Sequence, residues 1–341
     1  SFKDFAARLM ARLMSAVRDK GQRLHVLVAT SGDTGSAVGD AFHAVEGIDV
    51  TILYPRDEVS GRQKKQLDSI GDNVQAISVD GKFDDCQNLV KEAFADPELA
   101  SLNLTSANSI NFGRIMPQMI YYVYAYAQLA EPGESIVFSV PSGNFGDALG
   151  CEYARRMGLP VGKLVMPVNE NDGFPRYLQT GVYQKISPSL ACLSNAMNVG
   201  HPSNLARFFD LYGGTVDRTG EVHVYPDRED MKKHIYSVSV SDQETKETIR
   251  RVYETYGLLL EPHGAVGWRG LEVYLAENQT AGPCVSLETA HPAKFPDEIE
   301  ELLRIVPELP PSMRDIDSRK GEALSMSADY PALKAYLLGR R

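Results

Sequence analysis

A strand-to-helix transition occupies Val137-Phe138-Ser139-Val140-Pro141-Ser142-Gly143-Asn144-Phe145-Gly146-Asp147. The apolar, β-branched run from Ser135 to Val140 predicts a buried strand, and the pattern from Ala148 to Met157 predicts a helix. The first turn of a helix has backbone N–H groups without intrahelical partners, at the positive end of the helix dipole. Gly143 and Gly146 let the backbone approach a phosphate closely. The stretch therefore predicts an anion site, although an ordinary βα turn fits the same pattern.

Length and composition restrict the class of protein. A chain of 341 residues is long enough for two domains, and its net charge of −10 argues against nucleic acid and anionic membranes as partners. No apolar run approaches the roughly 20 residues that span a bilayer. The four cysteines and seven histidines are scattered without metal-ligand spacing, so we predict no metal site. Together these features favour a soluble protein of the cytoplasm.

The N-terminal half alternates between strand and helix patterns. Strands are predicted at 25–29, 50–54 and 74–79, and helices at 37–45, 62–70 and 83–94. Such alternation indicates a parallel α/β sheet, whose ligand crevice lies at the carboxyl ends of its strands. The glycine-rich turn Ser31-Gly32-Asp33-Thr34-Gly35-Ser36 falls at that edge. We predict a smaller α/β domain over 23–130.

The C-terminal half predicts a larger α/β domain over 131–341. Within it, residues 165–220 are irregular, which predicts an insertion that wraps the core rather than a part of the sheet. The capping box Ser241-Asp242-Gln243-Glu244 predicts a helix to Tyr256, and Cys284 to Leu287 predicts a strand. The tail after Pro307 has no assignable pattern. The fold class is therefore α/β, with two open, mainly parallel sheets flanked by helices.

Lys3 begins an amphipathic helix that ends near Gly21 and that we treat as a separate segment, 1–22, at the domain interface. A cation is unfavourable at a helix N-terminus. One interpretation is a solvated lysine; the other is a lysine whose amine loses its charge to form a Schiff base. Local sequence alone leaves both open.

Three polar strand ends, at Ser31–Ser36, Ser142–Gly146 and Thr289–Ala290, should meet one crevice between two α/β domains. Together with a lysine at the start of a helix, these strand ends would supply the groups that bind pyridoxal phosphate. One loop would hold the phosphate, a hydroxyl would meet the pyridine nitrogen and the lysine would hold the aldehyde. By composition Lys294 is a rival for that last role, and we prefer Lys3.

The chain resembles the bacterial and fungal class of the threonine synthase family, over nearly its whole length and in the same order. The matching motifs are Phe2-Lys3-Asp4, Ser31 to Gly35, Asn108 to Arg114, Ser142 to Gly146, Asn169 to Asp172, Asn198 to Asn204 and Thr289 to Phe295. Several motifs together are more specific than any one of them. Family members carry a long segment before the lysine, and only two residues precede it here, so we expect that the N-terminal part of the family sequence is absent from this chain.

The resemblance implies a fold type II pyridoxal-phosphate enzyme, of the tryptophan-synthase-β type, in threonine biosynthesis. It would be a carbon–oxygen lyase acting on phosphate, which converts O-phospho-L-homoserine and water to L-threonine and phosphate. The implied catalytic residue is Lys3. The implied cofactor-binding residues are Lys3, Ser142, Gly143, Asn144, Phe145, Gly146 and Thr289.

Two groups are expected to bind substrate. Ser31, Asp33 and Thr34 are candidates for the substrate carboxylate and the ring, although the charge of Asp33 would repel a carboxylate. Ser109, Asn111 and Arg114 are candidates for the substrate phosphate, because an N-terminal helical turn puts Asn111 and Arg114 on one face at i, i+3. An alternative for this segment is a helix cap with a solvated arginine.

Two other functions fit parts of the sequence. A related dehydratase or phospho-lyase would use the same cofactor and release a keto acid. A nucleotide-binding α/β protein would use the glycine turns without Schiff-base chemistry. The expected partner is a small-molecule substrate, and the protein would be a monomer or a small homo-oligomer.

Overall fold

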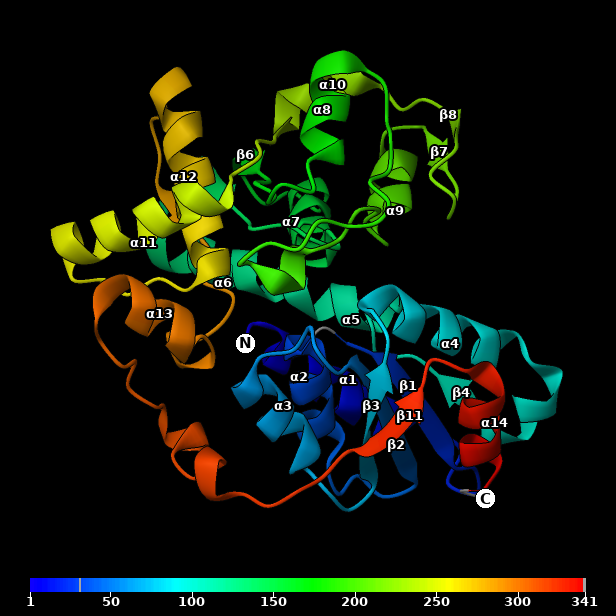
Figure 1. The fold of residues 1–341 in the computed structure, drawn as a ribbon. Coiled ribbons are helices and arrows are strands. Elements are labelled where there is room, and N and C mark those ends of the chain that lie inside the picture. Colours follow the sequence, from blue (N-terminus) through cyan, green and yellow to red (C-terminus); the bar gives the residue numbers. More distant parts are fainter. Residues whose placement is uncertain (31, 340–341) are drawn as a thin grey trace. The chain divides into compact units, whose positions relative to one another are not determined.

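A computed structural model of the chain describes residues 1–30 and 32–339, so the predicted site residue Ser31 lies outside the described residues (Figure 1). The chain forms two compact units. Unit 1 comprises Ser1–Arg114, Ala293–Phe295 and the chain from Pro307 onward, and unit 2 comprises Ile115–Pro292 and Pro296–Val306. Among the described residues, no helix combines the length and the apolar character needed to cross a membrane.

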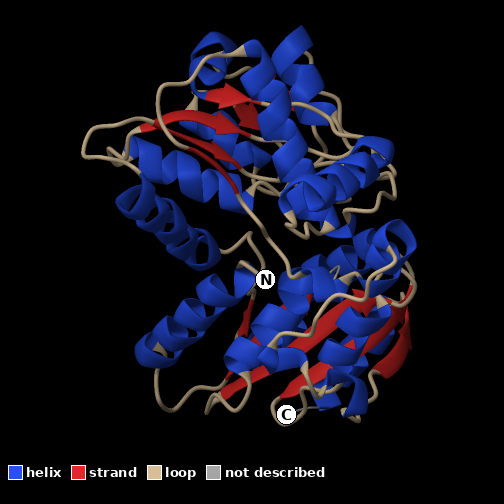
Figure 2. Cartoon of the chain, turned by 90° about the vertical axis from the view of Figure 1, so that its left-hand side faces the viewer, coloured by secondary structure: helices blue, strands red, loops and turns tan. Residues whose placement is uncertain are grey.

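Unit 1 is built on a five-stranded sheet in the order β11-β3-β2-β1-β4, with all neighbours parallel (Figure 2). The register places Val26 opposite Val50 and Ile52 opposite Ala76. The strands are β1 (Leu24–Ala29), β2 (Ile48–Pro55), β3 (Val74–Asp80), β4 (Leu104–Thr105) and β11 (Leu324–Ser327). The helices are α1 (Lys3–Val17), α2 (Asp33–Phe42), α3 (Gly61–Asp68), α4 (Phe83–Ala95) and α14 (Tyr330–Gly339), and α5 (Phe112–Ile115) contains the boundary with unit 2.

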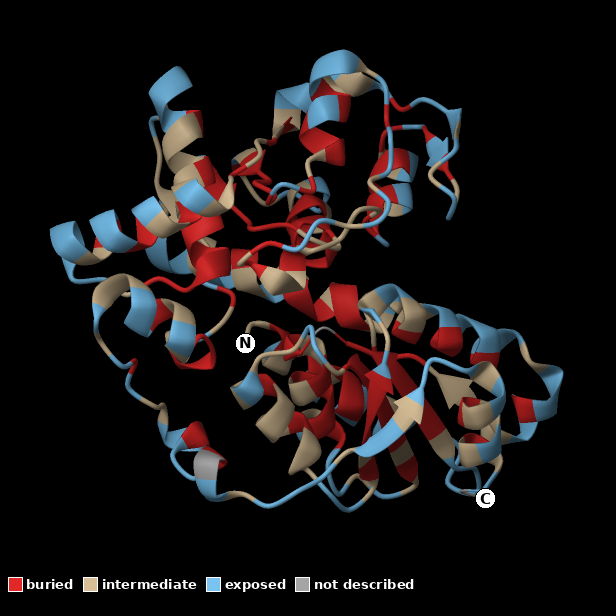
Figure 3. Cartoon of the chain, viewed as in Figure 1, coloured by how far each residue is buried: buried red, intermediate tan, exposed pale blue. Residues whose placement is uncertain are grey.

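The central strands β1, β2 and β3 of unit 1 are mostly buried, because helices cover both faces of the sheet (Figure 3). Alternate residues belong to different cores, since successive side chains of a strand point to opposite faces. Val26 and Val28 pack with α1 and α2, through residues such as Met10 and Val38. Leu27 packs with α4 and α14 on the other face.

Unit 2 contains a four-stranded parallel sheet in the order β10-β5-β6-β9 and a separate antiparallel pair, β7 and β8. The strands are β5 (Ile136–Ser139), β6 (Val161–Val165), β7 (Thr215–Val216), β8 (Val222–Val224), β9 (Ile235–Tyr236) and β10 (Cys284–Ser286). The helices are α6 (Met119–Leu129), α7 (Gly146–Arg156), α8 (Gly173–Thr180), α9 (Leu205–Leu211), α10 (Arg228–His234), α11 (Asp242–Tyr256), α12 (Pro262–Glu277) and α13 (Pro296–Leu303). The predicted α/β class with two parallel sheets is confirmed, and the capping box at Ser241 opens α11 as predicted.

The irregular segment 165–220 differs from its prediction. It was expected to wrap the core, but Phe174, Tyr177, Phe208 and Phe209 are fully buried parts of the largest core of unit 2. Two short helices, α8 and α9, carry these rings inward. The segment begins at the end of β6, a sheet strand, because Leu164 and Val165 pair with both β5 and β9.

The predicted domain boundaries also need correction. Residues 115–130 belong to unit 2 rather than to the first domain, because α6 packs on α7 and Tyr122 is buried in the core of unit 2. The unassigned tail returns to unit 1, where β11 pairs with β3 and Leu333 and Leu337 of α14 pack in the core. A 3-10 turn at Met116–Gln118, which contains Pro117, separates α5 from α6.

Glu152 of α7 is a fully buried acid in unit 2. Its carboxylate accepts hydrogen bonds from the guanidinium groups of Arg155 and Arg156, at 2.7–2.8 Å, and from the hydroxyl of Tyr212 at 2.9 Å. Burial raises the pKa of Glu152, but these hydrogen bonds outweigh burial, so the pKa is lowered overall. A charge removed from water in this way must keep its partners.

Glu152→Gln should therefore destabilise the protein by roughly 3 kcal/mol at neutral pH, measured by urea unfolding. The pKa of Glu152 is lower in the folded state than its usual 4.5, so this stability is present above that value and is lost as the pH falls through the folded pKa. The glutamine variant should lack that loss. Asp40→Asn is the control, because Asp40 pairs with Arg8 at the surface and should cost at most about 1 kcal/mol. Equal losses in the two variants would contradict the argument.

Candidate active site

The loop between β5 and α7 provides a cradle of backbone N–H groups in unit 2. Among the described residues, the N–H groups of Gly143, Asn144 and Phe145 have no hydrogen-bond acceptor. These groups lie just before the N-terminus of the 11-residue helix α7, where the dipole favours an anion. The sequence-predicted anion loop therefore has donors available for a phosphate.

The shape of this loop is fixed by its neighbours. Phe145 has a left-handed backbone, with φ of 67°, and its ring is buried edge-to-face against Phe174 and Phe208. A Cβ at Gly143 would lie 2.8 Å from the Cα of Met197, so only glycine fits there. Buried packing thus stabilises a backbone conformation that non-glycine residues rarely adopt.

Thr289 follows the neighbouring strand, β10, which pairs in parallel with β5. Because Ser286 is opposite Ser139, the two loops leave the same edge of the sheet. Thr289 is buried, and no hydrogen bond to its hydroxyl is found within the described part of the chain. The hydroxyl is therefore suited to a bound group.

Lys3 is the first residue of α1 in unit 1, and its side chain is buried, with 8 % of the residue exposed. The helix is held by Ala7, Met10 and Ala11, which pack in the core beneath α2. Lys3 is thus not the solvated surface lysine that one interpretation of the sequence offered.

Asp33 begins α2 and is also buried, but its carboxylate is already engaged. It accepts hydrogen bonds from Lys294 Nζ at 2.8 Å and from Gln63 Nε2 at 3.1 Å. The side chains of Asp33 and Lys294 are 3 % and 5 % exposed, so this is a buried ion pair. The preceding turn is tied by Thr30, whose hydroxyl accepts from the N–H groups of Gly32 and Gly35.

The segment from Asn108 to Arg114 lies in unit 1 as well. Arg114 is 3 % exposed, so it is not a solvated arginine, and its Nη1 donates to the carbonyl of Ala107. Asn111 orients the turn, because its side chain accepts from the N–H of Gly113 and donates to the carbonyl of Ser106. The position of the Arg114 side chain is therefore fixed in part by a hydrogen bond to a nearby residue of unit 1, Ala107.

Comparisons with known proteins identify the family. A family described as pyridoxal-phosphate dependent enzyme matches residues 1–289, and one described as threonine synthase, C-terminal, matches residues 264–337. Threonine synthase of Haemophilus influenzae is 40 % identical over 340 residues, covering 99 % of this chain and 76 % of its own. That of Escherichia coli is 37 % identical over 343 residues, covering 100 % and 76 %. The chain belongs to the threonine synthase family.

Solved threonine synthases share the architecture. The Escherichia coli structure matches with a TM-score of 0.88 at 36 % identity, covering 100 % of this chain and 76 % of that one. A structure with bound pyridoxal phosphate, from Brucella melitensis, matches with a TM-score of 0.88 at 35 % identity, covering 99 % and 75 %. Threonine deaminase of Solanum lycopersicum, at 16 % identity and a TM-score of 0.61, shares the fold alone.

The predicted threonine synthase activity, lyase class, pyridoxal-phosphate cofactor and fold type II architecture are thereby confirmed. The residues present fit the cofactor, because unit 2 offers unpartnered N–H donors at Gly143 and a buried hydroxyl at Thr289. The roles of the individual residues remain predictions.

Two buried groups were missed by the sequence interpretation. The pair of Asp33 and Lys294 joins positions far apart in the chain, which no local pattern indicates. The second group is at the start of α12, where Glu261 caps the helix and contacts His263, and these buried contacts were not predicted. The sequence signal for this second group is an acid, Glu261, and a histidine, His263, at the start of a helix.

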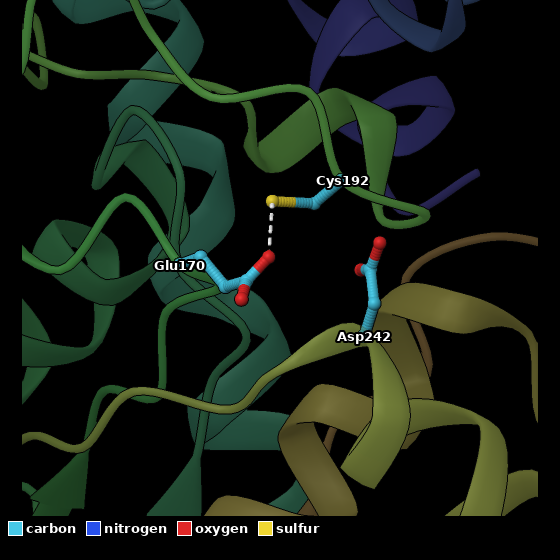
Figure 4. A group of neighbouring side chains, drawn as sticks. All are labelled: Glu170, Cys192 and Asp242. Carbon is cyan, nitrogen blue, oxygen red and sulfur yellow. Dashed lines mark hydrogen bonds between the residues drawn. The ribbon is translucent and has the colours of Figure 1, made fainter.

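A further polar group in unit 2 is formed by Glu170, Cys192 and Asp242 (Figure 4). Their ligand atoms lie within 4.8 Å of one another. However, the thiol of Cys192 donates to Glu170, and Asp242 accepts from the N–H of Leu193. Burial raises the pKa of Cys192 to about 11, so the thiol stays protonated at neutral pH. The group therefore anchors loops, and we assign no metal to it.

The contribution of the buried pair of Asp33 and Lys294 to the stability of the protein can be measured by mutation. Lys294→Met and Asp33→Asn should each destabilise the protein by about 3–5 kcal/mol, because each leaves an unpaired buried charge or donor. The double variant should lose less than the sum of the two, measured by urea unfolding as a double-mutant cycle. Additive losses would show that the two side chains do not stabilise each other.

Proposed function

We propose that this protein converts O-phospho-L-homoserine and water to L-threonine and inorganic phosphate, the last step of threonine biosynthesis. The observation that supports this most directly is the cradle of unpartnered N–H groups at Gly143, Asn144 and Phe145, beside the buried hydroxyl of Thr289. A phosphorylated aromatic cofactor requires both features.

In this proposal, Ser142, Gly143, Asn144, Phe145 and Gly146 hold the cofactor phosphate. Thr289 donates to the pyridine nitrogen, and Lys3 holds the aldehyde. Pyridoxal phosphate, when bound, delocalises the electron pair that remains after a proton leaves the α carbon of the substrate.

Lys3 then moves protons. Its freed amine removes the proton from Cα, and removal of a proton from Cβ allows the phosphate to leave Cγ, where a proton is gained. Water adds its hydroxyl to Cβ, and Cα is reprotonated to give threonine. A buried amine suits this work, because desolvation favours the neutral form that accepts a proton.

The substrate needs a second phosphate site, separate from the cofactor loop. We assign it to Ser109, Asn111 and Arg114, with Arg114 as the charged group. Asn111 fixes the turn by hydrogen bonds with Gly113 and Ser106. Its role in the proposed site is therefore to orient the turn, and it supplies no charge.

The turn at Ser31, Asp33 and Thr34 is the proposed site of the substrate carboxylate. The charge of Asp33 is compensated by Lys294, so Asp33 fixes the turn and would not repel a carboxylate as a free acid would. Thr34 and the backbone N–H groups would then make the contacts.

We further propose that the protein acts in the cytoplasm on a small-molecule substrate, as a monomer or a small homo-oligomer. The net charge of −10 disfavours nucleic acid as a partner.

The activity is tested with O-phosphohomoserine and the purified protein. Threonine and phosphate should appear in equal amounts, and a keto acid such as 2-oxobutanoate should not accumulate. Lys3→Ala should reduce turnover by about 10²–10⁴-fold, because the base is lost, while the Ser142–Gly146 loop still binds cofactor. Borohydride reduction and peptide mapping should place the cofactor on Lys3. A label on Lys294, or a keto acid as the main product, would overturn the assignment.

Arg114→Ala should weaken binding of O-phosphohomoserine and inhibition by inorganic phosphate together, by about ten- to a hundredfold. The reason is the loss of a charge-assisted contact of roughly 1.5–3 kcal/mol. Cofactor absorbance should be unchanged, and this shows that the variant is folded. Arg8→Ala, which removes an exposed arginine of unit 1, is the matched control. Normal substrate binding by Arg114→Ala, or loss of cofactor instead, would refute the second phosphate site.

A further inference from the structure

Asn204 ends the segment 198–204, a motif of the sequence that the proposed mechanism does not use. It is fully buried in unit 2 and stands at the cap position before α9. An asparagine at this position ordinarily accepts hydrogen bonds from N–H groups of its own helix. Within the described residues α9 has no such side-chain cap, although the carbonyl of Asn204 accepts from the N–H groups of Arg207 and Phe208. The side-chain amide of Asn204 is therefore engaged elsewhere.

The partner of this amide is the predicted phosphate loop. The backbone N–H and the side-chain Nδ2 of Asn204 both donate to the carbonyl of Asn144, at 3.2 and 3.1 Å. Nη1 of Arg207 donates to Oδ1 of Asn204. Because a guanidinium can only donate, this contact places the amide oxygen toward Arg207 and the amide nitrogen toward Asn144. Two donors of one oriented residue therefore hold a single carbonyl of the loop.

The position of this carbonyl also fixes the next N–H group. The peptide bond between Asn144 and Phe145 is planar and trans, so the carbonyl of Asn144 and the N–H of Phe145 point in opposite directions. With the carbonyl bound to Asn204, the N–H of Phe145 faces away from Asn204, and no described residue accepts its hydrogen. This N–H is one of the three donors of the candidate phosphate cradle.

Without Asn204, the backbone of the loop would relax if this peptide turned over. Half a turn of the Asn144–Phe145 peptide would take the φ of Phe145 from 67° into the ordinary negative range. The same rotation would direct the N–H of Phe145 toward the place that the carbonyl now occupies. The two hydrogen bonds from Asn204 oppose this rotation, so they keep a donor in place together with a rare backbone conformation.

A second contact holds the other side of the loop. A Cβ on Gly143 would lie 2.8 Å from the Cα of Met197 and 3.0 Å from the carbonyl oxygen of Ala196. These two residues belong to a 3-10 turn, Asn195–Met197, that directly precedes the segment 198–204. Residues 195–204 therefore contact the loop by packing at Gly143 and by hydrogen bonds at the following residue.

We propose that Asn204 is a positioning residue for the phosphate of the cofactor: it binds the carbonyl of Asn144 and thereby directs the N–H of Phe145 to the anion. The proposal rests on the function proposed above for the Ser142–Gly146 loop. Both hydrogen bonds form without a ligand, so the loop is preorganised and binding does not have to order it. The consequence is selectivity, because Asn204 strengthens binding of the phosphorylated cofactor and not of its unphosphorylated form.

The test compares two ligands, pyridoxal phosphate and pyridoxal, in full-length protein from which any cofactor has been removed. Asn204→Leu, which has a similar shape and no donor, should raise the Kd for pyridoxal phosphate by about ten- to a hundredfold, the value of one hydrogen bond to a charged group. The Kd for pyridoxal should stay the same, because this ligand has no phosphate. Both constants are measured by absorbance titration. An unchanged ratio of the two Kd values in Asn204→Leu would overturn the proposal.

Asn171→Leu is the matched control. Asn171 is also buried in unit 2, and its Nδ2 also donates to two acceptors, Oδ1 of Asn169 and the carbonyl of Leu190. This variant should lose stability in a similar way, but it should keep the ratio of the two Kd values. An equal fall of the ratio in both variants would show that general loosening of unit 2 is the cause, and would also overturn the proposal.

Gly143→Ala separates this proposal from the proposed function. Its Cβ would collide with Met197, so this variant should remove the preference for the phosphorylated ligand by displacing the loop itself. If Gly143→Ala removes the preference and Asn204→Leu keeps it, the loop assignment stands and the Asn204 assignment fails. A wild-type protein that binds both ligands equally would overturn the loop assignment and the Asn204 assignment together.

A measurement on the wild-type protein decides the case in which Asn204→Leu does not fold. In cofactor-free protein, the side-chain amide hydrogens of Asn204 should exchange slowly with solvent, measured by NMR. Added inorganic phosphate should move the N–H resonance of Phe145 downfield, because this group gains an acceptor, and should leave the Asn204 amide protected. Fast exchange at Asn204, or an unmoved Phe145 resonance, would overturn the proposal.

Discussion

A helix cannot satisfy the N–H groups of its own first turn, and the organisation of unit 2 follows from this constraint. The loop just before α7 adds N–H groups that no described residue accepts, those of Gly143, Asn144 and Phe145. Phe145 adopts a left-handed conformation there, and its ring is buried against Phe174 and Phe208. The aromatic core of the irregular segment therefore also fixes the conformation of the loop that carries these donors. The conformation of the predicted anion-binding loop and the packing of the core therefore depend on the same residue, Phe145.

Buried carboxylates in the two units are stabilised in two different ways. Glu152 remains charged because two arginines and a tyrosine surround it. Asp33 remains charged through one lysine that comes from a distant part of the chain. Each solution avoids an uncompensated buried charge, the most costly alternative.

Local pattern was sufficient for much of this architecture. The alternating units of the N-terminal half, the β5–α7 turn and the capping box of α11 were predicted, because each depends on neighbouring residues. The tail was not, since three of the four residues of β11 are exposed and it becomes a strand only by pairing with β3. The contact of Lys294 with Asp33 could likewise not be predicted, because it joins residues that are distant in sequence.

The return of the chain to unit 1 has a consequence for synthesis. All of unit 2 is synthesised before β11 and α14, because these elements follow Pro307. Until then β3 is a bare edge strand and part of the α4 face has no cover. Exposed edges and apolar faces of this kind are targets for aggregation and for chaperones. During synthesis, unit 1 is therefore incomplete until β11 and α14 have been made.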